Sequence, residues 1–199
     1  MEAHTLKTQR RPAGRGFAPV WLWLLAWLCL GGGTGAADVP KEYQVKGAFL
    51  YNFIKFTEWP AGTFPTTNAP VTIGVLGANP FNGTLMDMIR AKPIGGRDVQ
   101  MKLCASLAEA KACHVLFISA SEDKQLTATL AALKGAPVLT VGDTEAFAKA
   151  GGMINFVPEG ANLRFEINKA SADAAGVKLS AQLLRLARTV RGAPAGGGK

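Results

Sequence analysis

Apolar side chains recur with a helical period between residues 45 and 60, the densest aromatic segment outside the N-terminus. One face is formed by residues at spacings of three and four, namely Val45, Phe49, Asn52, Phe53, Phe56 and Trp59. Leu50, Tyr51 and Ile54 widen this face beyond half of the circumference, so we expect a largely buried helix. Proline lacks the N–H that would continue a helix, and Pro60 is therefore expected to end it.

Short apolar runs then alternate with helical segments. Strands are expected at residues 71–76, 99–103, 115–118 and 138–141, and helices at 80–90, 107–112, 122–134 and 144–150. Strands of four to six apolar residues that alternate with helices are typical of parallel sheets covered on both faces. The pattern predicts an α/β fold with a mainly parallel, Rossmann-like three-layer sheet and right-handed crossovers.

The pattern changes after Gly152, where two strands, 153–157 and 163–167, are joined by five residues. This connection suits an antiparallel hairpin. If Val157 faces Leu163, the core face holds Met153, Asn155, Val157, Leu163, Phe165 and Ile167. The other face then holds Ile154, Phe156, Arg164 and Glu166, either as an ion pair under a covering helix or as a partner-binding surface.

Two helices are expected to follow the hairpin. The first covers residues 168–175, and the second begins after the capping residue Ser180, with Leu183, Leu184, Ala187 and Val190 on its apolar side. Residues 191–199 are rich in Gly, Pro and Ala and are expected to form a disordered tail.

The N-terminal segment has the three parts of an export signal. A basic region is followed by an apolar run from Val20 to Leu30 and by the small residues Gly35, Ala36 and Ala37. The apolar run is too short to span a bilayer, so we expect cleavage after residue 37 and a soluble periplasmic product. Roughly 160 residues would remain, the length of a single domain at 38–190.

The charge of the chain does not favour nucleic-acid binding. The formal net charge of +8 falls to about +5 once the leader is removed. The remaining Lys and Arg are scattered, without a basic run or a helical stripe interleaved with aromatic residues. A solvated basic surface is therefore the simpler interpretation.

Only Cys104 and Cys113 remain after processing. In an oxidising compartment an even pair is more often bridged than free, and this bridge would close a loop of about ten residues. The loop-entropy model gives it about 2.7 kcal/mol of stabilisation. Two free, buried thiols are the alternative.

Few residues remain for catalysis or metal binding. His114 is the single histidine outside the leader, and it follows Cys113 at a strand start, where neighbours point to opposite faces. We therefore expect a structural histidine, and neither a catalytic set nor a metal or other cofactor. Gly77, Asn79 and Asp143 follow strand ends, where open α/β sheets bind ligands, and they form a candidate ligand crevice. Asp143 is also a typical turn or helix-cap residue.

The segment Val-Lys-Gly-Ala-Phe-Leu-Tyr-Asn-Phe-Ile-Lys-Phe-Thr-Glu-Trp-Pro at residues 45–60 resembles the opening signature of the YfiR-like family of periplasmic regulators. Later segments resemble it in order, among them Cys-His-Val-Leu-Phe-Ile-Ser at 113–119 and Arg-Phe-Glu-Ile-Asn at 164–168. The resemblance covers about residues 45–190, and Gly47 replaces the more usual alanine.

The resemblance implies a soluble periplasmic repressor that binds the periplasmic sensory domain of an inner-membrane diguanylate cyclase, or of a related sensory membrane protein. A periplasmic protein that binds a small ligand in the strand-end crevice is an alternative, and the scarcity of histidine disfavours a hydrolase. The sequence leaves a homodimer open. Under the first hypothesis, function lies in a surface, for which Ile154, Phe156, Arg164 and Glu166 are the candidates.

Overall fold

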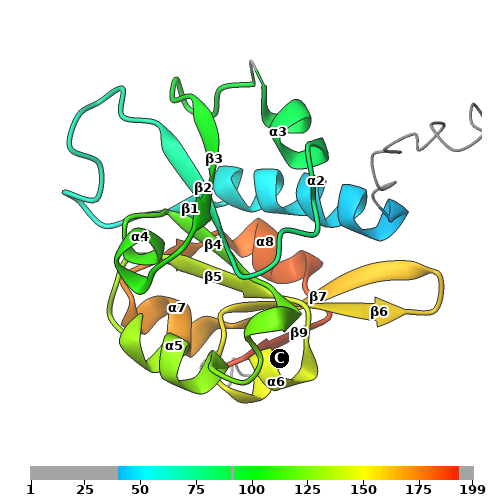
Figure 1. Ribbon diagram of the computed structural model, residues 1–199. Helices are drawn as coiled ribbons and strands as arrows, with labels where there is room; N and C mark the ends of the chain where they lie inside the picture. Colours follow the sequence, from blue (N-terminus) through cyan, green and yellow to red (C-terminus); the bar gives the residue numbers. More distant parts are fainter. Residues whose placement is uncertain (1–39, 91, 193–199) are drawn as a thin grey trace, which may run out of the picture. The chain divides into compact units, whose positions relative to one another are not determined.

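The computed structural model describes residues 40–90 and 92–192, which form an α/β fold around a seven-stranded sheet (Figure 1). The strands of this sheet are β2 (Val71–Leu76), β3 (Val99–Cys104), β4 (Val115–Ile118), β5 (Leu139–Gly142), β6 (Ile154–Glu159), β7 (Asn162–Asn168) and β9 (Thr189–Arg191). The α-helices are α2 (Lys41–Lys55), α3 (Thr84–Ile89), α4 (Leu107–Lys111), α5 (Leu126–Ala132), α6 (Glu145–Lys149), α7 (Lys169–Ala174) and α8 (Ala181–Leu186). A small second sheet pairs β1 (Thr57–Glu58) with β8 (Lys178–Leu179), antiparallel.

The strand order is β3-β2-β4-β5-β6-β7-β9, and every neighbouring pair is parallel except β6 and β7. The chain moves outward from β2 to β3 and then crosses back to β4 on the other side of β2. This order places a topological switch point between β2 and β4, as in other doubly wound α/β folds. The predicted fold class, a mainly parallel sheet with an antiparallel hairpin near the C-terminus, is confirmed.

Alternating side chains of the central strands supply two cores on opposite faces of the sheet. Val115 and Phe117 of β4 belong to the core that also contains buried residues of α2 and α3. Leu116 and Ile118 belong to the core that contains buried residues of α4, α5 and α6. Successive side chains of a strand point to opposite faces, so a strand covered on both faces must be apolar throughout. This requirement explains why the four apolar residues of β4 predict a buried strand from the sequence alone.

The aromatic helix is buried as predicted, but its buried face and its end differ from the prediction. The buried residues of α2 are Lys46, Gly47, Leu50, Phe53 and Ile54. Val45 is 39% exposed, and Asn52 is exposed as well. The helix ends at Lys55, because Thr57 and Glu58 leave it to pair with β8. Because β8 is more than 100 residues away in the chain, the spacing of apolar residues in α2 does not predict this pairing.

Several other helices are shorter than the sequence predicted. In the segment expected to be helical at 122–134, Glu122 ends a 3-10 turn, Ala120–Glu122, and the α-helix α5 covers only Leu126–Ala132. The last helix ends at Leu186, and Thr189–Arg191 forms β9 beside β7. Arg191 therefore belongs to the sheet and not to a tail. The expected leader and residues 193–199 lie outside the described residues. Among the helices described, none is long and apolar enough to cross a membrane.

Candidate functional site

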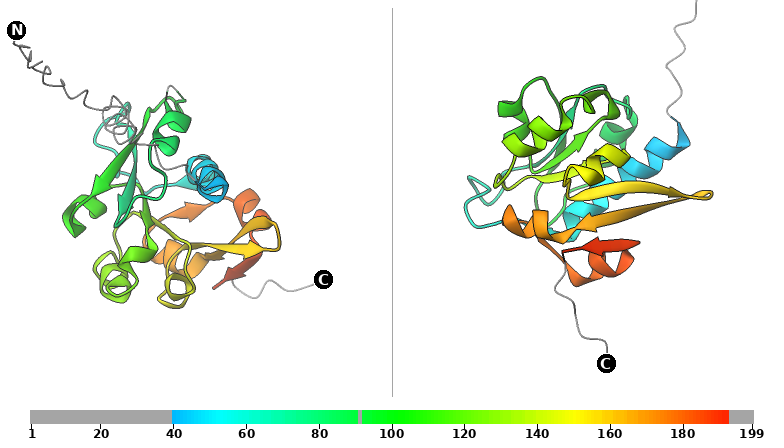
Figure 2. Two further views of the ribbon diagram at one scale, coloured as in Figure 1. Left: turned by 45° about the vertical axis from the view of Figure 1, so that its right-hand side comes forward. Right: turned by 90° about the horizontal axis from the view of Figure 1, so that it is seen from below.

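The β6–β7 hairpin extends beyond the end of the central sheet, and its length is visible in two views (Figures 1 and 2). Its pairing places Phe156 opposite Phe165 and Ile154 opposite Ile167. All four of these side chains are at most 3% exposed. The rings of Phe156 and Phe165 lie 5.8 Å and 5.1 Å from the ring of Phe53 on α2, so this face of the hairpin is core.

The predicted faces are therefore wrong for β6, whereas those of β7 are as predicted. Val157 pairs with Arg164 and not with Leu163, because the strands continue to Glu159 and Asn162 and leave only two residues in the turn. Gly160 has a φ of +60°, which glycine adopts without strain and which a tight turn of this kind uses. A register slip of one residue exchanges the two faces of a strand. Ile154 and Phe156 are thus core residues and are removed from the candidate partner surface.

Arg164 and Glu166 lie on the opposite face of the hairpin, as predicted, but in different settings. Arg164 is exposed, and its Nε lies 3.5 Å from Glu159 Oε2. The side chain of Glu166 is only 15% exposed, and Oε2 accepts a hydrogen bond of 3.3 Å from Arg191. The two residues both lie on β7 and do not pair with each other: Arg164 pairs across the hairpin with Glu159, and Glu166 pairs with Arg191.

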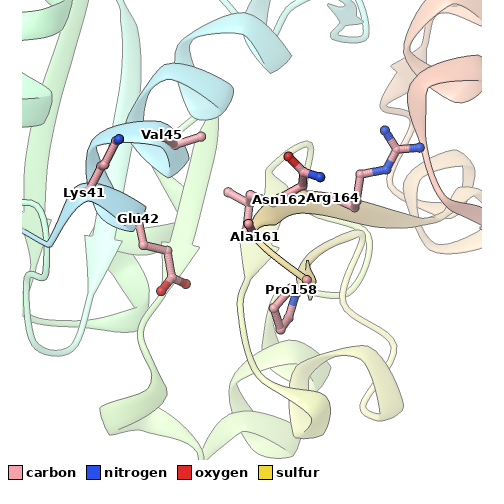
Figure 3. A pocket seen from close by; sticks show the side chains of 9 residues that line it. Lys41, Glu42, Val45, Pro158, Ala161, Asn162 and Arg164 are labelled. Atoms are coloured by element: carbon pink, nitrogen blue, oxygen red, sulfur yellow. The ribbon is translucent and has the colours of Figure 1, made fainter.

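A groove of about 620 Å³ lies between the first turns of α2 and the tip of the hairpin (Figure 3). We call it the hairpin groove, and its lining residues are Lys41, Glu42, Val45, Pro158, Gly160, Ala161, Asn162, Leu163 and Arg164. Figure 3 shows the residues of α2 on one side and those of the hairpin on the other. Val45 supplies an exposed apolar side chain, Lys41 and Arg164 supply positive charge, and Glu42 supplies a carboxylate that is paired with Lys46. Such a groove can take an apolar anchor flanked by an acidic group.

A buried ion pair lies behind this groove and joins α2 to the end of β5. Lys46 Nζ lies 2.6 Å from Asp143 Oδ2 and 2.6 Å from Glu42 Oε1. The side chains of Lys46 and Asp143 are 4% and 5% exposed. The hydroxyl of Tyr43 also donates a hydrogen bond of 3.0 Å to Asp143 Oδ2. These contacts fix the start of α2 against the carboxyl end of the sheet.

The contacts around this pair shift the pKa values of Lys46 and of the neighbouring Tyr43. Burial acts to lower the pKa of Lys46, but hydrogen bonds to Asp143 and Glu42 outweigh it and raise that pKa above its ordinary value. Burial and the negative charge of Asp143 raise the pKa of Tyr43. Lys46 is thus charged and Tyr43 is neutral at pH 7. Lys46 was not identified from the sequence, although it lies four and seven residues before the buried Leu50 and Phe53 on the same helical face.

The structure does not bring together the three residues of the candidate ligand crevice. Gly77 and Asn79 follow β2, Asp143 follows β5, and β4 lies between these two strands. The backbone N–H of Ala78 donates to Ser121 Oγ at 2.8 Å, so the turn after β4 closes over the end of β2. Asn79 Oδ1 caps the following turn by accepting from the N–H of Phe81. Gly77 and Asn79 therefore have local structural roles, and Asp143 lies at a separate position.

Cys104 and Cys113 are both buried and lie side by side as unbonded thiols, with 3.6 Å between their sulfur atoms. Gly74 of β2 makes room for them, because a Cβ there would lie 2.6 Å from Cys113 Sγ and 2.9 Å from Cys104 Sγ. Burial, and then the hydrogen bond with Cys104, raise the pKa of Cys113 to about 12. The structure thus places the two cysteines together, and the disulfide stays a prediction.

His114 is held by its neighbours at the opposite end of the strands from Asp143. Its Nδ1 accepts a hydrogen bond of 3.0 Å from the N–H of Thr72, and its ring stacks on Phe64 at 4.4 Å. The indole of Trp59 donates to the carbonyl of His114 at 3.2 Å. Burial, and to a lesser extent the charge of Arg97, lower the pKa of His114. These contacts fit the structural role that the sequence predicted.

Comparison with known proteins gives a family match. The family model described as YfiR/HmsC-like (DUF4154) matches residues 43–188, which include the central sheet up to β7, the hairpin and the buried ion pair. No curated protein matches the chain.

Two solved structures show a similarity to this chain. One is a conserved domain protein from Vibrio cholerae, 11% identical, with a TM-score of 0.50, which covers 75% of this chain. The other is an ABC domain from Streptococcus pneumoniae in complex with L-Trp, 15% identical over 60% of this chain, with a TM-score of 0.43. The chain spans 60% and 55% of the length of these two proteins. At these identities the first likeness supports the α/β fold alone.

Proposed function

This chain belongs to the YfiR/HmsC-like family, and from that membership we propose that it is a periplasmic regulator that restrains the synthesis of cyclic di-GMP. Its partner would be the periplasmic sensory domain of an inner-membrane diguanylate cyclase or of a related sensory membrane protein. The family match carries the proposal, since it extends over nearly all of the described residues. The export signal expected at residues 1–37 is in accord with a periplasmic location.

The hairpin groove is the surface that we assign to the partner. An interface is dominated by a few central anchors, and an exposed apolar residue beside a hollow is a suitable place for one. Val45 has this character, because it is 39% exposed and lines the groove. Glu42 in the same groove is already paired with Lys46, so Lys41 and Arg164 would favour a partner segment that carries a carboxylate next to its apolar anchor.

The buried pair of Lys46 and Asp143 gives this surface a fixed geometry. The groove is built from two segments that are far apart in the chain, so its shape depends on how α2 is held. Lys46 links α2 to the end of β5, and the rings of Phe49 and Phe53 on α2 pack against Phe156 on the hairpin. A surface that is formed before binding requires less ordering during association, which favours affinity.

The proposal is tested by deleting the gene in its native host and measuring cellular cyclic di-GMP. Loss of a repressor should raise the cyclic di-GMP concentration, and expression of the full chain from a plasmid should lower it again. A leader-deleted chain, residues 38–199 preceded by Met, provides the control because it would stay in the cytoplasm. A deletion strain with an unchanged cyclic di-GMP concentration would contradict the proposed function.

A further inference from the structure

A hollow of about 470 Å³ lies at the amino ends of β2 and β4, beside the loop that joins β1 to β2. It is lined by residues of that loop, by the end of α4 and by Thr72, Gln100 and His114. We call it the amino-end hollow. It shares no lining residue with the hairpin groove, and its volume lies within the usual range of small-molecule sites.

The side chains of Gln100, Thr72 and His114 lie in a row across three neighbouring strands. Thr72 is opposite Gln100 in the pairing of β2 with β3, and the backbone N–H of His114 donates to the carbonyl of Thr72 at 3.0 Å. His114 comes two residues before Leu116, which belongs to the core that includes residues of α4. Residues two apart on a strand share a face, so the row lies on the α4 side of the sheet, where the end of α4 completes the hollow.

The hydrogen bonding of His114 leaves one N–H without a partner. Its Nδ1 accepts from the backbone N–H of Thr72, so the neutral ring must carry its proton on Nε2. No described residue accepts a hydrogen bond from Nε2. Among the described residues, Asp143 Oδ1 is the one fully buried side-chain nitrogen or oxygen without a partner, so Nε2 is not sealed in the interior. His114 as a whole is only 8% exposed, and Nε2 is thus a donor held in place by a buried ring.

The other polar groups of the hollow are also donors. Thr72 Oγ1 accepts a hydrogen bond of 2.9 Å from Gln100 Nε2, which leaves the hydroxyl hydrogen of Thr72 able to donate. Lys111 at the end of α4 is exposed and forms no ion pair with a described residue. No Asp or Glu is among the described residues that line the hollow. A cation would meet Lys111 without a balancing carboxylate, whereas an anion would find one positive charge and two positioned donors.

We propose that the amino-end hollow binds a small aliphatic carboxylate, whose oxygens accept hydrogen bonds from His114 Nε2–H and from the hydroxyl of Thr72. The ammonium group of Lys111 balances its charge, and hydrogen bonds to a carboxylate are stronger than those between neutral groups. The aliphatic part lies against Pro65 and Pro70, which supply apolar surface in the same hollow. The inference does not rest on the proposed function, because the hollow is separate from the groove assigned to the protein partner.

Titration of the purified protein at neutral pH with three four-carbon probes tests the class of ligand. Butyrate carries a carboxylate, butanamide has the same shape without charge, and butylamine carries an ammonium group. We expect butyrate to bind at least about tenfold more tightly than either of the other probes. Equal binding of butyrate and butanamide, preferential binding of butylamine, or no binding of butyrate at millimolar concentrations would overturn the proposal.

The nitrogen resonances of the His114 ring test the location in the natural protein. His114 is the single histidine after residue 37, so its signals are readily assigned in protein without the leader. We expect NMR spectra to show a neutral ring with the proton on Nε2, and we expect the Nε2 signal to shift as butyrate binds. A ring protonated on Nδ1, or an Nε2 signal that is unchanged at saturation with butyrate, would show that His114 is not the donor.

A charge-removing variant tests the contribution of Lys111. Lys111→Gln should weaken butyrate binding by about tenfold and leave butanamide binding unchanged, because the charge of the lysine attracts only the anion. Lys124→Gln is the matched control, since Lys124 is an exposed lysine that does not line the hollow. If the two variants bind butyrate equally tightly, Lys111 does not balance the charge of the ligand and the proposed site is wrong.

Discussion

At the scale of single residues, the ion pair of Lys46 and Asp143 has the largest expected effect on stability. Both side chains are almost completely buried, so the loss of one partner leaves the other charged and unpaired in the interior. A sequence does not show such a pair, because its members are separated by 97 positions and meet only when α2 packs on the sheet. The helical face of Lys46 could be predicted, but its partner could not.

Asp143→Ala should therefore lower the free energy of unfolding by about 3–5 kcal/mol, as measured by urea denaturation. The double variant Lys46→Met and Asp143→Leu should recover much of this loss, because it removes both charges and keeps apolar volume. Lys149→Met, which breaks the exposed pair with Glu145, is the control and should have little effect. An Asp143→Ala protein as stable as the natural protein would contradict the stabilising role assigned to the pair.

The contacts of His114 predict a dependence of stability on pH. Burial lowers its pKa below the ordinary value of 6.5, so the folded protein binds fewer protons than the unfolded chain in this range. The free energy of unfolding should then fall as the pH drops below about 6.5, because the unfolded chain takes up a proton that the folded protein excludes while Nδ1 accepts the hydrogen bond from Thr72. We expect a lower melting temperature at pH 5.5 than at pH 7.5. In His114→Gln this difference should shrink, and an equal difference in both proteins would contradict the assignment.

At the scale of elements, the strands were easier to predict than the faces of the hairpin. A parallel strand that is buried on both sides must be apolar along its length, and 115–118 and 71–76 show this directly in the sequence. The hairpin strands were also found, but their register depends on the number of residues in the turn. A loop of five residues and a turn of two predict opposite faces for Phe156, and the apolar pattern alone fits both.

Substitutions in the hairpin test the observed register. Phe156→Ala removes a buried ring that packs against Phe49 and Phe53, and should lower the free energy of unfolding by about 3–5 kcal/mol. Arg164→Ala, on the other face of the same hairpin, should change it little. Thermal melts of both proteins measure this difference. A Phe156→Ala protein as stable as the natural protein would contradict the observed register and place Phe156 on the face away from the core.

Cys104 at the end of the edge strand β3 contacts Cys113, which lies just before β4. Whether the two form a disulfide can be tested chemically. The sulfur atoms are 3.6 Å apart, so a bond would require only a small movement. We expect protein from an oxidising compartment to resist alkylation until it is reduced and unfolded, and to lose a few degrees of melting temperature on reduction. Because burial can also slow alkylation, the alkylation is done in denaturant without a reductant. Labelling of both thiols under those conditions would contradict the bridge.

At the scale of the whole molecule, the fold places two hollows on the two sides of the hairpin. The hairpin groove faces α2, a second hollow of about 320 Å³ faces α6, and Pro158 lines both. Asp143 lines this second hollow and also holds Lys46, whose neighbour Val45 lines the hairpin groove. The sequence identified Asp143 and Arg164 as candidates, but it did not show that they line two separate hollows beside one hairpin. That relation depends on the tertiary packing of α2, β5 and the hairpin.

The most direct test of the proposed function is to measure cyclic di-GMP in the deletion strain expressing variants of the groove. Val45→Asp places a carboxylate at the apolar anchor, and Met86→Asp is the control, an exposed apolar residue of α3 outside the groove. Periplasmic abundance is measured in the same cells. If the groove binds the partner, the Val45→Asp protein accumulates normally but leaves cyclic di-GMP as high as in the deletion strain, while the Met86→Asp protein restores repression. Full repression by an abundant Val45→Asp protein would contradict the assignment of the groove as the repressing surface.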